Sequence, residues 1–247
     1  MPVQEAELRV VVDVVLPQRR PLRPLAAFRG SLAQRVHASL REAILSMSLR
    51  PGDILRKPEI CEMLGVSRSP VSEAVARLAV EHLVQVVPQA GTYVARFSLV
   101  EIREGAFLRE ALELAAVERV AQGVTEEQLV LLRRNLRLQA ALIEDHDVAG
   151  FYRSDAEMHE LILGFTGFRR LALMADASWA HVNRARQLIL PQPGRVAATL
   201  AEHLAIMAAI EARDPVAARE ATRLHLGKLI GILEPLAQNR PDLFDPE

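Results

Sequence analysis

Four side chains of metal-ligating type interrupt the apolar faces of three predicted helices in the second half of the chain. Asp155 and His159 stand one helical turn apart within one apolar row, and His203 and His225 interrupt the rows of two later helices. A buried carboxylate is costly unless it is paired, and a neutral imidazole needs partners for both ring nitrogens. One carboxylate and three imidazoles are a suitable ligand set for Zn²⁺, Ni²⁺, Mn²⁺ or a similar divalent ion. The sequence therefore predicts a metal site made by these four residues.

The four residues fall within a run of six predicted helices. Ser98 and Thr125 can act as N-caps, each with an acidic or amide residue three positions later, and Asp214-Pro215 is a strong start signal for the last helix. The helices are predicted to begin near residues 98, 125, 147, 168, 194 and 214, and the last ends near residue 238. Six amphipathic helices with short connections predict an antiparallel helical bundle.

The preceding segment reads as three short helices followed by a β-hairpin. Ser31 can cap the first helix, Gly65 ends the second, and Ser67 caps the third. The apolar period then becomes two, which predicts strands at residues 84–87 and 92–95. Two short helices joined by a tight turn, with a hairpin behind them, predict a winged helix-turn-helix. The expected fold is mainly α, with this N-terminal domain and the C-terminal six-helix bundle.

Composition and charge restrict the class of protein further. The chain has 247 residues, of which 50% are hydrophobic and 25% charged, so it can bury a sizeable core. Its one cysteine, Cys61, cannot form an internal disulfide, and no apolar run approaches the roughly 18 residues of a membrane span, so we expect a cytoplasmic protein. Residues 1–98 hold 13 Lys and Arg against 9 Asp and Glu, whereas residues 99–247 hold 17 against 22. The basic front half is consistent with a polyanionic partner and equally with a solvated surface.

The third predicted helix opens with Ser67-Arg68-Ser69, where a recognition helix meets base edges and phosphates. This segment, together with Pro51 to Leu55 and Pro88 to Val94, resembles the winged helix-turn-helix of GntR-superfamily transcriptional regulators over residues 31–97. The resemblance and the polar character of these positions indicate a set of candidate DNA-binding residues. They are Arg56, Lys57, Ser67, Arg68, Ser69, Ser72, Gln89 and Thr92.

The chain departs from the GntR pattern at four places. Pro58 and Ser72 stand where the family commonly has arginine, and the hairpin tip at Gln89 lacks the usual arginine. His82 stands where a glycine is expected after the third helix. Fewer phosphate contacts lower salt-dependent affinity, so either the operator is unusual or binding is weak.

The C-terminal part resembles the FCD ligand-binding domain of FadR-type regulators, in the VanR-like group, over about residues 99–235. Asp155-x-x-x-His159, Glu202-His203 and His225 fit the metal set of that family. The resemblance implies a small organic acid as effector, bound beside the metal. The candidate effector-binding residues are Arg109, His181 and Arg184. Arg109 has an equal alternative as a helix-surface ion pair with Glu113, and a packed core histidine is the favoured interpretation of His181.

Together these observations predict a DNA-binding transcriptional repressor that acts as a homodimer on a palindromic double-stranded operator. The expected parts are an N-terminal extension at 1–30, the winged helix-turn-helix domain at 31–97, the effector and metal-binding domain at 98–238 and a C-terminal tail at 239–247. Two alternatives remain: a metal-dependent enzyme that uses the same four residues to activate water, and a sensor of the metal alone. No second acidic residue joins the apolar rows, and no catalytic residue is predicted.

Overall fold

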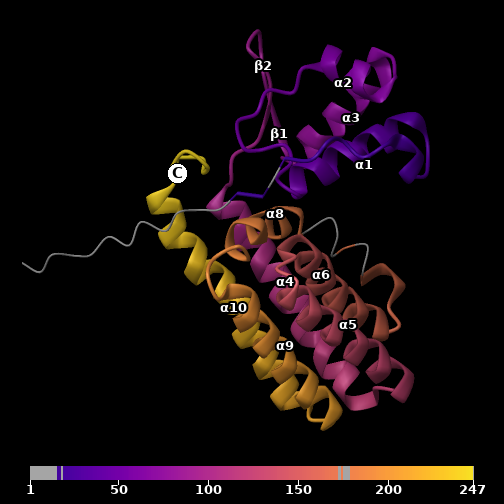
Figure 1. Cartoon of the computed structure of the whole chain (residues 1–247), viewed down its shortest axis with the longest axis vertical. Helices are drawn as coiled ribbons and strands as arrows, with labels where there is room; N and C mark the ends of the chain where they lie inside the picture. The colour runs from indigo at the N-terminus through magenta and orange to yellow at the C-terminus, as the bar shows by residue number, and fades with distance from the viewer. Residues whose placement is uncertain (1–15, 18, 172–173, 175–178, 247) are drawn as a thin grey trace, which may run out of the picture.

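The protein is mainly helical, with a small winged helix-turn-helix part above a larger helical bundle (Figure 1). The computed structural model describes residues 16–17, 19–171, 174 and 179–246. The valine-rich stretch of the predicted N-terminal extension lies almost wholly outside these residues. A short 3₁₀ helix, η1 (Leu25–Ala27), precedes the first α-helix. No helix in the described ranges is long and apolar enough to cross a lipid bilayer.

Three α-helices open the first part: α1 (Leu32–Leu45), α2 (Lys57–Leu64) and α3 (Arg68–Val80). Ser31 caps α1 as predicted, because its hydroxyl accepts from Gln34 N while Gln34 Oε1 accepts from Ser31 N. Gly65 has a φ of 64°, the left-handed conformation that ends α2 and turns the chain into α3. Ser67 is the N-cap residue of α3, but its side chain makes no capping hydrogen bond. The exposed hydroxyl of Ser67 is therefore presented at the start of α3.

The wing is a two-stranded hairpin that closes the apolar core of this part. Strands β1 (Val84–Val87) and β2 (Gly91–Val94) pair antiparallel, with Val84 opposite Val94. Both of these valines pack in one cluster with buried residues of α1 and α3, such as Leu40 and Leu78. His82, between α3 and β1, has a φ of 56°. This left-handed backbone is the physical reason for the glycine that the GntR pattern has there.

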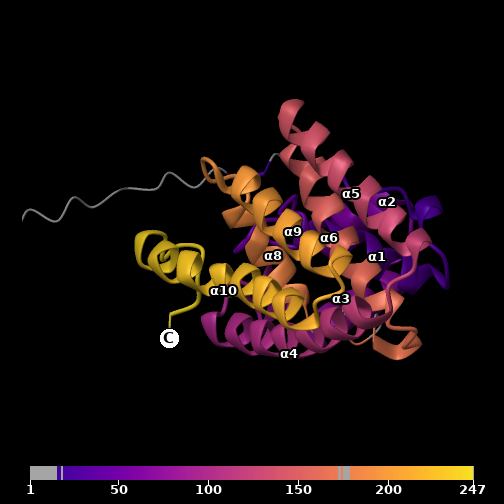
Figure 2. The ribbon, with the colours of Figure 1, turned by 90° about the horizontal axis from the view of Figure 1, so that it is seen from below.

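Six described helices form the bundle, and Figure 2 shows them from its lower end. They are α4 (Leu99–Gly123), α5 (Glu126–Glu144), α6 (Val148–Phe165), α8 (Ala180–Ile189), α9 (Arg195–Glu211) and α10 (Pro215–Asn239). The side chains of Ser98, Thr125, Asp147 and Asp214 accept backbone N–H groups of the helices they begin. The helix expected over residues 168–190 differs in one respect: residues 169–171 and 174 are helical, but Trp179 lies in a turn and α8 begins at Ala180.

Helix α8 lies where the two parts of the molecule meet (Figure 1). Ala180 belongs to the apolar cluster of the winged helix-turn-helix part, whereas Val182 packs in the main cluster of the bundle. Leu188 belongs to a third cluster, in which Phe97 from the linker meets Phe244 from the C-terminal tail. Helix α8 is therefore packed against both parts at once.

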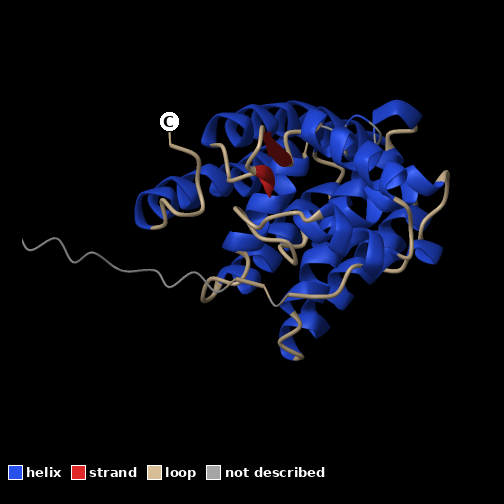
Figure 3. Ribbon diagram, turned by 90° about the horizontal axis from the view of Figure 1, so that it is seen from above, coloured by secondary structure: helices blue, strands red, loops and turns tan. Residues whose placement is uncertain are grey.

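Figure 3 shows the hairpin as the short strand pair among the helices.

Candidate metal centre

The four predicted metal ligands lie together inside the bundle. Asp155 and His159 come from α6, His203 from α9 and His225 from α10. One ligand atom of each lies within 4.8 Å of the ligand atoms of the other three. All four side chains are buried, from 0% exposed at His203 to 8% at His225. The structure thus brings together the polar residues that interrupt three separate apolar rows.

Each histidine of the cluster turns Nδ1 outward to a hydrogen-bond acceptor on another element. These contacts join His159 to Glu113 Oε2 (2.6 Å), His203 to Gln139 Oε1 (2.8 Å) and His225 to Glu202 Oε2 (2.7 Å). The amide orientation of Gln139 follows from its other contact, since its Nε2 donates to Asn135 Oδ1 at 2.8 Å. An outer partner of this kind fixes the ring tautomer and the ring orientation of a metal-binding histidine.

The two carboxylates of this outer layer are ionised. Burial alone would raise the pKa of Glu113, but the charge of Arg109 and the hydrogen bonds from Arg109 and His159 hold it well below its ordinary value. Burial would also raise the pKa of Glu202, but hydrogen bonds from His225 and Arg195 bring it to about 2. An ionised carboxylate can only accept, so Nδ1 of His159 and Nδ1 of His225 both carry hydrogen.

The three imidazoles are neutral, so their Nε2 lone pairs face one another. Burial lowers the pKa of His225 to about 4, although its hydrogen bond to Glu202 acts in the opposite direction. Burial is also the largest cause of the lowered pKa values of His159 and His203. Nε2 of His159 lies 3.3 Å from Nε2 of His225, and the buried Nε2 of His203 has no hydrogen-bond partner among the described residues. Lone pairs at this separation disfavour one another, and the donor set fits a divalent cation.

Asp155 supplies the carboxylate of the cluster and is itself held in place. Its Oδ1 lies 3.5 Å from Nε2 of His203, and its Oδ2 forms an ion pair with Nη2 of Arg186. Because the imidazole of His203 is neutral and its Nε2 carries a lone pair, this contact with Asp155 Oδ1 is not a hydrogen bond. Arg186 is positioned in turn by Asn183 Oδ1 at 3.2 Å and by the ring of Tyr152, whose centroid is 5.2 Å from its Cζ. All four ligands therefore have an oriented outer partner.

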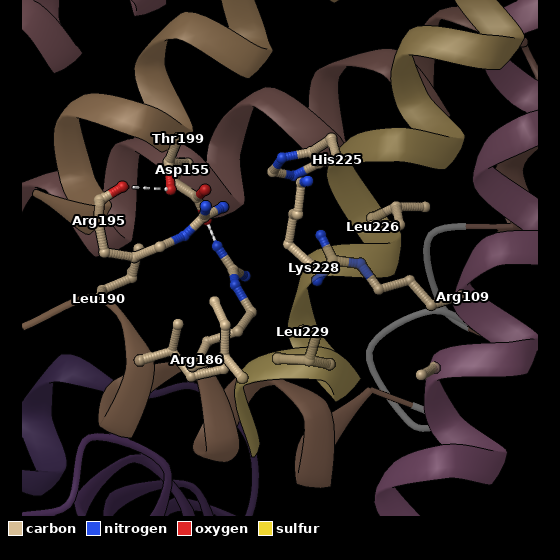
Figure 4. A pocket seen from close by; sticks show the side chains of 13 residues that line it. Arg109, Asp155, Arg186, Leu190, Arg195, Thr199, His225, Leu226, Lys228 and Leu229 are labelled. Carbon is tan, nitrogen blue, oxygen red and sulfur yellow. Dashed lines mark hydrogen bonds and ion pairs between the residues drawn. The ribbon is translucent and has the colours of Figure 1, made fainter. Parts of the chain in front are cut away.

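A cavity opens beside the cluster and is lined by positive charge (Figure 4). Asp155 and His225 form part of its wall, with apolar side chains such as Leu229. The basic residues of the wall come from four helices: Arg109, Arg186, Arg195 and Lys228. A concave, partly apolar site with converging cations beside a metal-ligand cluster is suited to a small organic anion.

Arg109 is the predicted effector residue that lines this cavity. Its Nε donates to Glu113 Oε1 at 2.6 Å, and the side chain is only 5% exposed. Its Cζ lies 5.2 Å from the centroid of the Trp179 ring. The ion pair with Glu113 that the sequence offered as an alternative therefore forms, but in the interior and not on the surface.

The other two predicted effector residues lie elsewhere, which corrects their assignment. Neither His181 nor Arg184 belongs to the wall of the cavity. Nε2 of His181 donates to the carbonyl oxygen of Glu81 at 3.2 Å, and the Arg184 guanidinium carbon lies 4.6 Å from the ring centroid of Phe97. Helix α8 turns these side chains toward the junction with the winged helix-turn-helix part. Periodicity predicts that a residue is buried, but it does not identify what covers it.

The sequence reasoning missed the outer partners of the histidines. Gln139 is fully buried and follows Asn135, also buried, by one turn of α5. A buried amide pair on an apolar face is the same signal that identifies the four ligands, and it could have identified Gln139. Glu113 and Glu202 are charged residues of a type that is usually exposed on a helix surface, so only the packing of the helices reveals their role.

The predicted DNA-binding residues lie on the surface with one exception. Six are exposed and Lys57 is half-buried; the exposed ones are Arg56, Ser67, Arg68, Ser69, Ser72 and Gln89. Arg56 forms an ion pair with Glu59 at 3.0 Å. Thr92 is only 7% exposed, because alternate residues of β2 face the core and Thr92 lies on the same side as Val94. Thr92 is therefore corrected to a core-facing residue.

Comparison with known proteins finds two family matches in the chain. Residues 32–94 match the family described as bacterial regulatory proteins, gntR family, and residues 104–228 match the FCD domain. The HTH-type transcriptional repressor RspR of Escherichia coli (strain K12) is 31% identical over 214 residues, which cover 87% of this chain and 94% of that protein. An uncharacterized HTH-type transcriptional regulator of Streptomyces ambofaciens is 32% identical over 209 residues, 85% of this chain and 88% of its own length.

A solved structure, E. coli McbR/YncC, has the same fold, with a TM-score of 0.72 at 22% identity over 83% of this chain and 98% of that one. The matched families and the relatives are transcriptional regulators and not enzymes, so the enzyme alternative is set aside. With its winged helix-turn-helix and its helical bundle, the chain belongs to the GntR family and is a DNA-binding transcriptional regulator with an FCD domain.

Proposed function

We propose that this regulator holds a divalent metal ion with Asp155, His159, His203 and His225, and that a small carboxylate bound beside the ion modulates its affinity for operator DNA. The observation that carries the proposal is the 3.3 Å separation of Nε2 in His159 and Nε2 in His225. Both Nδ1 atoms already donate to ionised carboxylates, so two lone pairs face each other. A cation between them removes the repulsion and uses both nitrogens as ligands.

Each residue around the cluster has a defined task in this proposal. Nε2 of each histidine and Oδ1 of Asp155 are the metal-facing atoms, and Glu113, Gln139 and Glu202 hold the rings at the angle that ligation needs. A bound ion of this class supplies a Lewis-acidic position that a ligand carboxylate can occupy. Arg186 keeps Oδ2 of Asp155 occupied, which leaves Oδ1 directed at the histidines.

The charge of the cavity wall supports an anionic effector. Arg109 and Arg195 are paired with Glu113 and Glu202, so their charges are largely neutralised. Lys228 is exposed, stands three residues after His225 on α10 and lines the same cavity. It forms no ion pair with any residue that the structure describes. Together with a divalent ion it leaves the cavity positive, which favours a small organic acid.

The DNA-binding side of the proposal rests on the start of α3. Ser67, Arg68 and Ser69 are exposed there, and an arginine at this place of a recognition helix can read a guanine through two hydrogen bonds. We infer a cytoplasmic homodimer on a palindromic operator, because one short recognition helix reads only a half-site. Repression is the inferred direction, since RspR and the NanR protein of Cronobacter sakazakii carry repressor names.

The test is a titration of full-length protein against a fluorescent duplex that the protein itself selects from a random-sequence library. The protein is stripped with a chelator and reloaded with Zn²⁺, Ni²⁺ or Mn²⁺, and lactate, gluconate, succinate and citrate are added in turn. We expect at least one acid to change the Kd for DNA by about fivefold or more in the loaded protein only. A change with metal alone would instead make the protein a metal sensor, and no change in any arm would refute regulation through this site.

A further inference from the structure

One carboxylate at the junction of the two parts contacts histidines from both. Glu101, in the first turn of α4, accepts from Nδ1 of His82 through Oε1, and its Oε2 lies 3.3 Å from Nδ1 of His181. His82 directly follows the recognition helix and its C-cap residue Glu81, whereas His181 belongs to α8. On its other side, His181 donates from Nε2 to the carbonyl oxygen of Glu81. The end of the recognition helix is thus joined to two helices of the bundle.

The same end of α3 is also joined to α1. The Glu81 carboxylate accepts hydrogen bonds from Nε2 of His37 at 2.6 Å and from Nε of Arg41 at 3.0 Å. Together with the contact from His181 to the Glu81 carbonyl oxygen, they place Glu81, the C-cap residue of α3, between α1 and α8. A displacement of His181 therefore acts on a residue that two helices of the winged helix-turn-helix part already hold, so it moves that part as a unit.

Helix α8 reaches from this junction to the metal-ligand cluster. His181 contacts Glu81, and Arg186, five residues later on the same helix, forms the ion pair with Asp155 and lines the cavity. Five residues of α-helix span about 7.5 Å, and both residues lie within the one continuous 10-residue helix α8. Ala180, the first residue of α8, already packs in the apolar cluster of the winged helix-turn-helix part. Any shift of Arg186 on ligand binding is therefore carried to the end of α3.

His82 makes the direct contact between the end of the recognition helix and α4. Its φ of 56° lies in the left-handed region that favours glycine, so a glycine can take this place without backbone strain. The imidazole is directed to Glu101, although 67% of the side chain is exposed. A glycine would fit the backbone better but would leave Glu101 without this contact.

We propose that Glu101, His82 and His181 form a coupling site through which occupancy of the metal cavity repositions the recognition helix. The inference rests on the proposed function for its input and adds the route by which that input reaches α3. Two changes remove the route without touching a metal ligand. His82→Gly removes the contact with Glu101 and suits the left-handed backbone, and Glu101→Gln removes the charge of the carboxylate. The matched control is Glu104→Gln, which changes an exposed carboxylate one turn along α4.

The experiment is hydrogen–deuterium exchange of the full-length protein with and without Zn²⁺ as the only probe. In the wild type and in Glu104→Gln, we expect Zn²⁺ to slow exchange about fivefold or more around Asp155, His203 and His225 and also in residues 78–83 at the end of α3. In His82→Gly and Glu101→Gln, the effect near the ligands persists and the effect in residues 78–83 falls below about twofold.

The outcomes separate the two proposals. If Zn²⁺ changes nothing near the ligands in the wild type, the proposed metal site fails, and the coupling site loses its input. If the ligand region responds but residues 78–83 do not, the metal site stands and the coupling site is overturned. If residues 78–83 respond equally in His82→Gly and Glu101→Gln, Glu101 is not the route.

Discussion

The two parts of the molecule differ in where their candidate functional residues lie. In one part they are on the surface, and in the other they are in the core. In the winged helix-turn-helix part the core is apolar, and the predicted DNA contacts such as Arg68 lie outside it in water. In the bundle the core itself holds the carboxylate of Asp155 and three imidazoles. Burial keeps the imidazoles neutral. Exposed contacts add little to the free energy of folding, whereas buried polar groups oppose it until they are paired. We therefore expect metal and pH to affect the stability of the bundle more than that of the DNA-binding part.

The largest effect that separates the two parts is expected from loss of a metal ligand. His203→Ala removes one of four donors from a fully buried site, so metal affinity should fall by more than the 10–100-fold that loss of an outer partner costs. Competition with a chromogenic chelator measures it. The matched control is His146→Asn, because His146 is exposed with a φ of 55°, which asparagine tolerates. Equal affinity in the two variants would contradict the site.

The next effect concerns the outer partner of that ligand. Gln139→Leu leaves Nδ1 of His203 without its acceptor, so metal affinity should fall about 10–100-fold. Gln139→Glu keeps an acceptor at the same place and should retain most of the affinity. The same chelator competition compares the two variants. Full affinity in Gln139→Leu would show that the ring is oriented by packing alone.

The metal ligand His203 and its outer partner Gln139 also differ in how well the sequence predicts their roles. Each ligand interrupts an apolar row of its own helix, so helical periodicity is sufficient to predict that His203 and His225 point inward. Capping residues such as Ser31 and Asp214 similarly fix where helices begin. The partner of a buried group depends on how separate helices pack, and no local pattern contains that information. The roles of Glu113 and Glu202 were missed for this reason.

The same limit explains the assignments that needed correction. His181 lies in a row that correctly predicts a largely buried side chain, but the row faces the junction and not the cavity. In β2, alternation is correctly predicted, whereas the four residues of the strand do not indicate which set faces the core. Thr92 falls in the inward set. Periodicity thus gives burial, and only tertiary packing gives its direction.

A smaller effect is expected from pH in the metal-free protein. The folded pKa of His225 is about 4, below its ordinary value of 6.5, so between these values the unfolded chain binds a proton that the folded chain does not. Stability is therefore complete above about pH 6.5 and is lost as the pH falls toward 4. We expect about 2 kcal/mol less unfolding free energy at pH 5 than at pH 7 from this group.

Urea unfolding at the two pH values measures the difference, and His225→Gln is the comparison, since it removes the titrating group from the same position. The variant should show a flatter dependence on pH than the wild type. Glu202 interferes little, because its folded pKa is about 2 and the unfolded carboxyl, with an ordinary pKa of 4.5, is still mostly ionised at pH 5. An identical slope in both proteins would mean that His225 is already protonated in the folded state at pH 5.

The DNA-binding part should give a different response, in affinity and not in stability. Arg68→Ala removes an exposed guanidinium from the first turn of α3 and should weaken operator binding about tenfold, within the ~1–3 kcal/mol of a specific base contact. Its unfolding free energy should stay close to that of the wild type. Arg77→Ala, at the other end of α3 and paired with Glu73, is the control. Equal losses in both variants would indicate a general charge effect.

The smallest effect is expected at Thr92, and it tests which face of the hairpin meets DNA. Thr92→Val keeps the shape of a side chain that is 7% exposed and faces the core, so operator affinity should change less than about twofold. Fluorescence anisotropy with the duplex used for Arg68→Ala measures the change. Gln89→Ala, at the exposed hairpin tip, should lose more affinity than Thr92→Val. The reverse order would require the inward face of β2 to turn outward on DNA, since a buried hydroxyl cannot contact a phosphate without that movement.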